Sequence, residues 1–489
     1  MIRRSLNGPA LASRSTLLLL AALVICFPVG MGFPLATVAA RASAGTSGSA
    51  AHTVNASAAW PDSIWPETSD LWHFENLEGV ILIPATLRGT TGRDTAGPMV
   101  LDTGAGYLAV DRSLATWLGV SDATQDGDYN NTESVALAPR RLTRATIGKR
   151  QIDQIGPVLT IDAEVIRNVT DRPVLGLLGK AQFANAALAI DYRAQTVAMI
   201  PLPGDGAGKG ETAAPGASAS SPKQLRARRD QSSRQLKPIL PRDAIAVPFR
   251  LEGDGKILVT ATVSEANGSQ RSQTLTLIVD TGATKSVLFE ESLDFKSKRY
   301  RSWPALHGMS APTLFGAAEA FVTRIPRFEL AALDRQVRWD GLDAAVIRSE
   351  LRPLLSRLVG EPVDGLLGYT FLKHFRVVLD YPNLILWLSP QPTGWDDRPY
   401  EYSQVGAQVE RRGGDARIVA VIEDSPADRA GLLAGDAIIA VDGVPAASLD
   451  IVALSERLEG PPGSVVEVRV RRDGAERSYR MERRWLLAP

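Results

Sequence analysis

Two stretches of the chain repeat the same order of apolar runs and turn residues. Each copy opens with an apolar run that predicts a strand, at residues 80–85 in the first copy and 257–263 in the second. A polar turn follows, and a second apolar run then leads directly into Asp-Thr-Gly-Ala, at 102–105 and at 280–283. Each copy therefore predicts two neighbouring strands, with an acidic turn after the second one.

The repeat continues further along the chain. Residues 174–179 read Val-Leu-Gly-Leu-Leu-Gly, and residues 363–368 read Val-Asp-Gly-Leu-Leu-Gly. Asp191 and Asp380 stand twelve residues after these runs, and a tyrosine and an apolar strand follow each of them. We expect both aspartates at strand turns, where Asp is common. Because the same elements recur in one order and one spacing is preserved, the chain contains two copies of one mostly-β unit.

The chain from 402 to 485 has a different pattern. Ser-Pro-Ala at 425–427 is followed by Ala-Gly-Leu at 430–432, and Gly-Asp at 435–436 is followed by Val-Asp-Gly at 441–443. This order resembles the bacterial-type PDZ domain family. The resemblance implies a small α+β domain with a helix-flanked groove, in which an extended peptide binds as an added strand.

The same resemblance implies which loop of this domain would bind the C-terminal carboxylate of a peptide ligand. That loop is Val405, Gly406 and Ala407, and it departs from the family's glycine-hydrophobic-glycine form. Three roles therefore stay open for the domain: capture of substrate C-termini, control of access to another site, and a structural role in assembly.

Residues 1–42 have the pattern of an export segment. A basic start precedes a short apolar core at 16–27, and small residues that suit cleavage follow. We expect either a cleaved signal peptide or an uncleaved membrane anchor, followed by a spacer at 43–70. The rest of the chain is then exported to a bacterial periplasm or cell envelope, with a membrane contact only if the segment is uncleaved.

Residues 203–243 separate the two copies. They are rich in Gly, Ala, Ser and Pro at first and become basic towards the end. Such a composition buries too little apolar surface to offset chain entropy. The pattern therefore predicts a flexible basic linker, with lobe 1 at 71–202 and lobe 2 at 244–392.

Composition and charge exclude several kinds of function. The 54 basic residues balance the 54 acidic ones, which gives no reason to expect a nucleic-acid partner. Cys26, the only cysteine, lies in the export segment, so the mature chain would lack a thiol nucleophile. No two of the four histidines are spaced as a metal pair. We therefore expect no metal and no cofactor.

The doubled Asp-Thr-Gly suggests a pair of carboxyl groups. If the two copies pack about a pseudo-twofold axis, Asp102 and Asp280 meet at that axis. Two carboxyl groups at hydrogen-bonding distance cannot both ionise easily, so they share one proton. The ionised member can then take a proton from water while the protonated member donates to a carbonyl oxygen.

Both copies resemble the retropepsin-like and pepsin-like aspartic peptidases. The Asp-Thr-Gly-Ala runs and the later Leu-Leu-Gly runs carry the resemblance. It implies a mostly-β, bilobal double-β-barrel fold, an internal pseudo-dimer, and an endopeptidase acting on peptide or protein substrates. By that resemblance Asp102 and Asp280 are catalytic. The supporting residues would be Thr103 and Thr281, which brace the two loops across the axis, and Gly104 and Gly282, which give backbone support.

Hairpins that cover a peptide cleft are expected in both copies. The candidates are residues 132–147 in the first copy and 307–319 in the second, where glycines suit a mobile hairpin. A plain surface hairpin is an equally good interpretation of the second stretch.

Other functions explain the sequence less well. A serine peptidase would need a nucleophile elbow and a partner histidine, and neither stands out. A two-carboxylate glycosidase leaves the repeated motifs unexplained. The alternative that stays open is a catalytically inactive scaffold of the same fold that binds extended peptides.

Overall fold

The computed structural model describes residues 69–121, 135–138, 140–202, 221–265, 272–293, 299–313, 316–392, 395 and 400–487. The predicted export segment and nearly all of the predicted spacer lie outside these ranges. Within them, no helix combines the length and the apolar character that crossing a bilayer requires.

Lobe 1 consists mainly of strands. Its elements are β1 (Asp70–His73), β2 (Glu75–Leu77), β3 (Val80–Arg88), β4 (Asp94–Leu101), β5 (Leu108–Asp111), α1 (Arg112–Trp117), β6 (Val135–Leu137), β7 (Leu142–Ile147), β8 (Arg150–Ile155), β9 (Val158–Ile161), α2 (Glu164–Thr170), β10 (Gly176–Leu178), β11 (Ala186–Asp191) and β12 (Thr196–Pro201). Nine of the strands form one sheet in the order β6-β9-β5-β10-β4-β3-β7-β8, with β2 beside β3.

Lobe 2 repeats this plan. Its elements are β13 (Ile245–Pro248), β14 (Arg250–Glu252), β15 (Lys256–Ser264), β16 (Ser272–Val279), β17 (Ser286–Phe289), β18 (Ala305–Thr313), β19 (Gly316–Leu330), β20 (Val337–Arg348), α4 (Leu351–Val359), β21 (Gly365–Leu367), α5 (Tyr369–Leu372), β22 (Phe375–Asp380) and β23 (Ile385–Pro390). Eight strands form a sheet in the order β14-β15-β16-β21-β17-β20-β19-β18, and a further pairing of β15 with β19 curls it into a half-barrel.

The two lobes share their strand patterns residue by residue. In both β3 and β15 the first four residues are buried, and buried positions then alternate with more exposed ones. The first half of each strand therefore lies inside the lobe, and the second half has one face outside. The short Leu-Leu strand has the same place in both sheets, because β10 lies between β4 and β5 and β21 lies between β16 and β17.

A six-stranded sheet joins the lobes. Its order is β1-β12-β11-β22-β23-β13, with three strands from each lobe, and β11 pairs antiparallel with β22 at the centre. Asp191 and Asp380 end the two central strands and accept backbone hydrogen bonds from the turns that follow, from Arg193 and from Asn383. Both aspartates therefore lie at strand turns, as expected.

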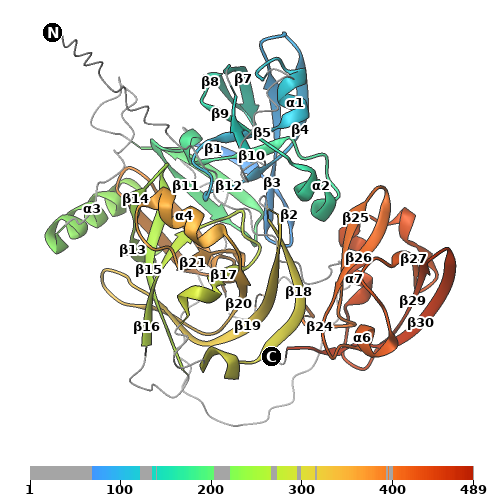
Figure 1. The fold of residues 1–489 in the computed structure, drawn as a ribbon. Helices are drawn as coiled ribbons and strands as arrows, with labels where there is room; N and C mark the ends of the chain where they lie inside the picture. Colours follow the sequence, from blue (N-terminus) through green and yellow to red (C-terminus); the bar gives the residue numbers. More distant parts are fainter. Residues whose placement is uncertain are drawn as a thin grey trace, which may run out of the picture.

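The C-terminal domain has its own sheet and its own apolar core. Its elements are β24 (Ser403–Gln404), β25 (Ala407–Arg412), β26 (Asp415–Val421), α6 (Pro426–Ala430), β27 (Ala437–Val441), β28 (Val444–Pro445), α7 (Ile451–Leu458), β29 (Val465–Arg472), β30 (Ala475–Glu482) and β31 (Arg484–Trp485). The sheet order is β25-β26-β27-β29-β30, which leaves β25 at one edge. This domain packs beside both lobes (Figure 1).

The predicted flexible linker is wrong for residues 222–243. Helix α3 (Pro222–Gln235) begins at Ser221, whose side chain and that of Gln224 form a reciprocal capping box. The helix docks on the joining sheet, because Ser232 is fully buried and hydrogen bonds to Asp380 and to Trp387. The sequence did not predict this helix because its composition is polar and only a few of its residues make the contacts that hold it. Residues 203–220 lie outside the described ranges.

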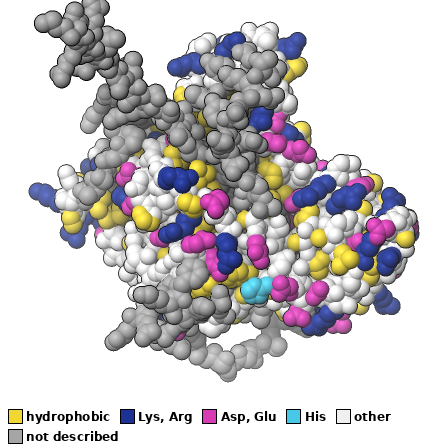
Figure 2. All heavy atoms as spheres, in the orientation of Figure 1, with side chains coloured by type: hydrophobic (Ala, Val, Ile, Leu, Met, Phe, Trp, Pro, Cys, Tyr) yellow, Lys and Arg dark blue, Asp and Glu magenta, His cyan; other side chains and the backbone are white. Residues whose placement is uncertain are grey.

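Charges on the surface are mixed. Figure 2 shows Lys and Arg side chains interspersed with Asp and Glu over the visible face. This distribution agrees with the formal net charge of zero.

Candidate active site

The two Asp-Thr-Gly loops meet at the interface between the lobes. They follow β4 and β16, and their threonines hydrogen bond reciprocally. The backbone N–H of Thr103 donates to Oγ1 of Thr281 at 3.0 Å, and the N–H of Thr281 donates to Oγ1 of Thr103 at 3.1 Å. Each hydroxyl also donates to a carbonyl of the other lobe, to Val279 at 3.0 Å and to Leu101 at 2.8 Å. The two loops are thus fixed to each other about a pseudo-twofold axis.

This bracing brings Asp102 and Asp280 together. Both aspartates are fully buried, and their carboxyl groups interact directly. Oδ1 of Asp102 accepts the N–H of Ala105 at 2.9 Å, and Oδ1 of Asp280 accepts the N–H of Gly282 at 2.8 Å. The Oδ2 atom of each has no hydrogen-bond partner within the described part of the chain. Backbone amides therefore hold one oxygen of each carboxyl group, and no donor in the described part of the chain reaches the other oxygen.

Burial changes the acidity of both carboxyl groups. It raises the pKa of Asp102 to about 6, although backbone N–H groups of Ala105 and Gly104 favour the ionised form. Burial also raises the pKa of Asp280 well above its usual range, and the nearby charge of Asp102 raises it further. The pair is therefore set to hold a single proton between the pKa values of its two carboxyl groups.

The Leu-Leu-Gly strands β10 and β21 hydrogen bond to the backbone of these loops. The N–H of Asp102 donates to the carbonyl of Leu178 at 3.0 Å, and that of Asp280 donates to Leu367 at 3.1 Å. A Cβ atom at Gly368 would lie 2.3 Å from the carbonyl oxygen of Lys285. Only glycine fits such a close backbone approach, which is why both runs end in this residue.

A buried lysine next to the pair was not predicted from the sequence. Lys256, at the start of β15, has no exposed area, and its Nζ lies 2.6 and 2.8 Å from the carboxylate oxygens of Asp254. Its positive charge lowers the pKa of both Asp102 and Asp280, against the larger effect of burial. The register between the copies could have revealed it, because Lys256 occupies the position that Val80 has in lobe 1.

Two buried tyrosines lie near the opposite carboxyl groups. Burial and then the charge of Asp280 raise the pKa of the Tyr192 hydroxyl above its usual range. Burial and the charge of Asp102 do the same for Tyr381. Both hydroxyls therefore stay neutral around the pair.

The hairpin predicted in the second copy is present. Strands β18 and β19 pair antiparallel over most of the predicted stretch 307–319. The candidate in the first copy differs, because β6 pairs with β9 whereas β7 pairs with β3 and β8. Its described part is therefore not one hairpin, and residues 132–134 lie outside the described ranges.

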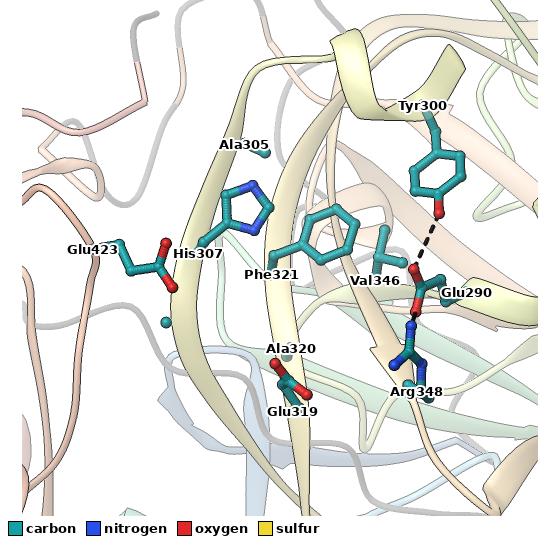
Figure 3. A pocket seen from close by; sticks show the side chains of 11 residues that line it. Glu290, Tyr300, Ala305, His307, Glu319, Ala320, Phe321, Val346, Arg348 and Glu423 are labelled. Carbon is teal, nitrogen blue, oxygen red and sulfur yellow. Dashed lines mark hydrogen bonds and ion pairs between the residues drawn. The ribbon is translucent and has the colours of Figure 1, made fainter. Parts of the chain in front are cut away.

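A cavity of about 390 Å³ lies on the side of the lobe 2 hairpin next to the C-terminal domain. The rings of His307 and Phe321 contact each other at a tilt, with centroids 5.0 Å apart, and Glu423 reaches towards the cavity from the C-terminal domain (Figure 3). At the other end Glu290 accepts a hydrogen bond from Tyr300 at 3.0 Å and pairs with Arg348 at 2.6 Å (Figure 3). Neither Asp102 nor Asp280 lines this cavity.

The loop predicted to bind a peptide carboxylate is covered. Val405, Gly406 and Ala407 are all buried, and Gly406 lies against Ser425 and Leu486. Its role in peptide capture stays a prediction. In the described ranges, no group of three His, Cys, Asp or Glu side chains has the arrangement of a metal site.

Comparison with known proteins identifies the C-terminal domain. The PDZ domain family matches residues 417–472, which confirms the PDZ domain predicted from the sequence over that range. A search of curated proteins gave no match for the chain.

Three solved structures are similar to parts of the chain. The photosystem II D1 C-terminal processing protease is 31% identical with a TM-score of 0.16, over 17% of this chain and 22% of that one. An aspartic proteinase from Irpex lacteus is 13% identical with a TM-score of 0.35, over 66% of this chain and 98% of that one. Basic 7S globulin from soybean is 11% identical with a TM-score of 0.37, over 68% and 99%. The chain thus spans about a fifth of the first protein.

Proposed function

We propose that this chain is an exported aspartic-type endopeptidase that hydrolyses peptide bonds with a water molecule activated between Asp102 and Asp280. The observation that carries the proposal is the reciprocal pairing of Thr103 with Thr281, which fixes the two buried carboxyl groups next to each other. Export rests on the sequence of residues 1–42 alone.

The proposed reaction follows from one shared proton. The ionised carboxyl group takes a proton from water, and the resulting hydroxide attacks the carbonyl carbon of the scissile peptide bond. The protonated carboxyl group donates its proton to the carbonyl oxygen, which gives a neutral tetrahedral intermediate. That intermediate then breaks its C–N bond. The carboxyl group that took the proton from water gives it to the leaving nitrogen, and the other carboxylate takes a proton back from a hydroxyl group of the intermediate, which restores the single shared proton. The hydrogen bond between the two carboxyl groups lowers the pKa of Asp102 and raises that of Asp280, which favours Asp102 as the base and Asp280 as the acid.

The peptide-binding scaffold is the second candidate. The observation that favours it is the complete burial of Asp102 and Asp280, because a substrate reaches them only if part of the structure above them moves. The PDZ domain also gives the chain a peptide-binding module that needs no catalysis.

Cleavage of an unfolded protein substrate tests the proposal. We expect the wild type to cleave it and a statine-type inhibitor to block the cleavage. Asp102→Asn and Asp280→Asn should each lower the rate by at least about a thousandfold, because either change removes the shared proton's site. Asp153→Asn, at an exposed carboxylate that pairs only with surface groups, is the matched control and should leave the rate unchanged.

The two candidate functions predict different outcomes. Full activity in Asp102→Asn or in Asp280→Asn would exclude a shared-proton pair. A wild type that binds peptides with no cleavage between about pH 3 and 8 would favour the scaffold.

A further inference from the structure

The edge of the PDZ domain that faces lobe 1 is occupied by lobe 1 itself. Among the described strands, β25 pairs only with β26 in its sheet, and α7 flanks it. PDZ domains take an extended peptide along such an edge, between the strand and the helix. Helix α2 of lobe 1 packs against both β25 and α7. The structure therefore places part of the chain where a peptide ligand would lie.

Polar contacts fix this arrangement at the end of α2. Oδ2 of Asp171, the residue that ends the helix, accepts the N–H of Ile451 at 3.1 Å. The same oxygen accepts Nε and Nη2 of Arg411 at 3.3 and 3.2 Å. Ile451 is the first residue of α7, so the carboxylate lies at the positive end of that helix as well as beside a guanidinium group.

An ion pair and an apolar contact extend the interface. Arg172 contacts Asp450 at 3.3 Å and also pairs with Glu75 of lobe 1 at 2.6 Å. Val452, on α7, packs against the apolar cluster of lobe 1 that also contacts Val165 on α2. The contact therefore combines a partly buried apolar patch with a carboxylate that Arg411 and the N–H of Ile451 hold.

Strand β25 and the turn after β26 also hydrogen bond to lobe 2. The N–H of Glu423 donates to the carbonyl of His307 at 3.0 Å. The side chain of Gln408 accepts the N–H of Ser310 at 2.8 Å and donates to its carbonyl at 3.2 Å. His307 and Ser310 both belong to β18, in the hairpin predicted to cover the cleft. One small domain thus connects that hairpin with lobe 1.

We propose that residues 164–171 are an internal ligand of the PDZ groove, and that this contact holds the proteolytic site closed. A peptide that presents a carboxylate to Arg411 and to the N–H of Ile451 competes with Asp171. It thereby separates the PDZ domain from lobe 1 and allows the hairpin of lobe 2 to move. This regulatory step rests on the proposed peptidase function, whereas the occupancy of the groove does not.

The first test measures occupancy without using activity. In the full-length chain, Asp171→Asn removes the charge and keeps a residue that tolerates the left-handed φ of 52°. We expect amide hydrogen exchange in α2 and at Ile451 to become at least about tenfold faster. Asp162→Asn changes an exposed aspartate at the other end of α2 and should leave exchange in α7 unchanged. Arg172→Gln, a second variant that removes the ion pair to Asp450, should act in the same direction as Asp171→Asn.

The second test uses a peptide copy of residues 164–171, Glu-Val-Ile-Arg-Asn-Val-Thr-Asp. It should bind Asp171→Asn at least about tenfold more tightly than the wild type, because the internal competitor is weakened. Two further peptides show which carboxylate binds. An amidated peptide lacks the C-terminal carboxylate, and a peptide ending in Asn lacks the side-chain carboxylate. Binding that needs only the free C-terminus assigns the site to chain ends, and binding that needs the Asp side chain assigns it to internal acidic residues.

The outcomes separate this inference from the proposed function. Unchanged exchange in both variants, together with equal peptide affinity, would overturn the internal ligand. If the amides exchange faster in the variants but saturating peptide does not raise the cleavage rate of the wild type, the proposal that this contact holds the proteolytic site closed is wrong. If the wild type and Asp171→Asn both fail to cleave while exchange and binding change as expected, the peptidase proposal fails and the internal ligand stands.

Discussion

At the scale of single residues, the proton shared by Asp102 and Asp280 depends on groups that lie beside them. Burial raises the pKa of both carboxyl groups, and the positive charge of Lys256 opposes that effect. Lys256 is itself held by Asp254, whose carboxylate lies against the first Asp-Thr-Gly loop at Gly106. A charged neighbour of this kind has no counterpart at Val80 in lobe 1, so the two halves of the site differ electrostatically.

The pH profile of cleavage should show this effect. In the wild type we expect the rate to fall as the pH drops below about 6, because Asp102 then becomes protonated and the pair loses its base. Lys256→Met removes a positive charge that favours the carboxylate form of Asp102, so the pKa of Asp102 rises. The fall of the rate on the acidic side of the profile therefore moves to higher pH. The rate measured between pH 4 and 8 on one peptide substrate tests this prediction.

An exposed lysine provides the control for that experiment. Lys149→Met, in the turn between β7 and β8, should leave the profile of the wild type unchanged. If Lys256→Met folds and its rate falls at the same acidic pH as in the wild type, this lysine does not set the ionisation of the pair.

At the scale of elements, each Asp-Thr-Gly loop depends on a short strand that packs next to it. Strand β21 runs parallel to β16, pairing Leu367 with Val279, and its backbone carbonyl receives the N–H of Asp280. The chain then passes so close to its neighbour that Gly368 has no room for a side chain. The strand, the loop and the glycine therefore form one packing unit.

Gly368→Ala tests how strictly this unit is packed. The new Cβ would lie 2.3 Å from the carbonyl oxygen of Lys285 and 2.7 Å from that of Ala283, so the backbone has to move. We expect a loss of unfolding free energy of ~3 kcal/mol, as is typical of overpacked cores, together with loss of cleavage. Chemical denaturation followed by circular dichroism measures the first effect.

Gly360→Ala is the matched glycine control. Gly360 ends α4 with a positive φ of 88° and has no other atom near its Cβ position. Gly360→Ala should lower the unfolding free energy by only about 1 kcal/mol, because alanine is strained in the left-handed backbone conformation. Equal losses in the two variants would mean that close packing behind Asp280 is not the main constraint at Gly368.

At the scale of the whole molecule, the lobes are joined by continuous strand pairing. The central sheet takes three strands from each lobe, and one apolar cluster extends through both lobes. Helix α3 packs on the same sheet, where Leu236 and Ile239 are also buried. The connection along the chain between the lobes is therefore not what holds them together.

Production of the protein as two chains, 1–212 and 213–489, tests this conclusion. We expect the two chains to copurify at a one-to-one ratio when expressed together, because β11 still pairs with β22. Size-exclusion chromatography with light scattering measures the complex. Separate elution of two folded chains would show that the covalent connection is essential.

Several features were accessible from the sequence because they repeat or are local. The two Asp-Thr-Gly-Ala runs and the two Leu-Leu-Gly runs identified equivalent positions, and the structure brings Asp102 and Asp280 together. The glycine and proline pattern of residues 425–443 predicted a PDZ domain, which the family match confirms over 417–472. The catalytic roles of the aspartates stay predictions until cleavage is measured.

Other features were decided only by the tertiary structure. The docking of α3, the burial of Lys256 beside the aspartate pair and the contact of Asp171 with Arg411 join residues far apart in the chain. No periodic pattern marks such contacts, because they depend on how finished lobes and domains pack against one another. The sequence by itself determined the duplicated unit and its candidate chemistry, since local motifs encode both. The surroundings that set the acidity of the pair and cover the PDZ groove arise only when those units assemble.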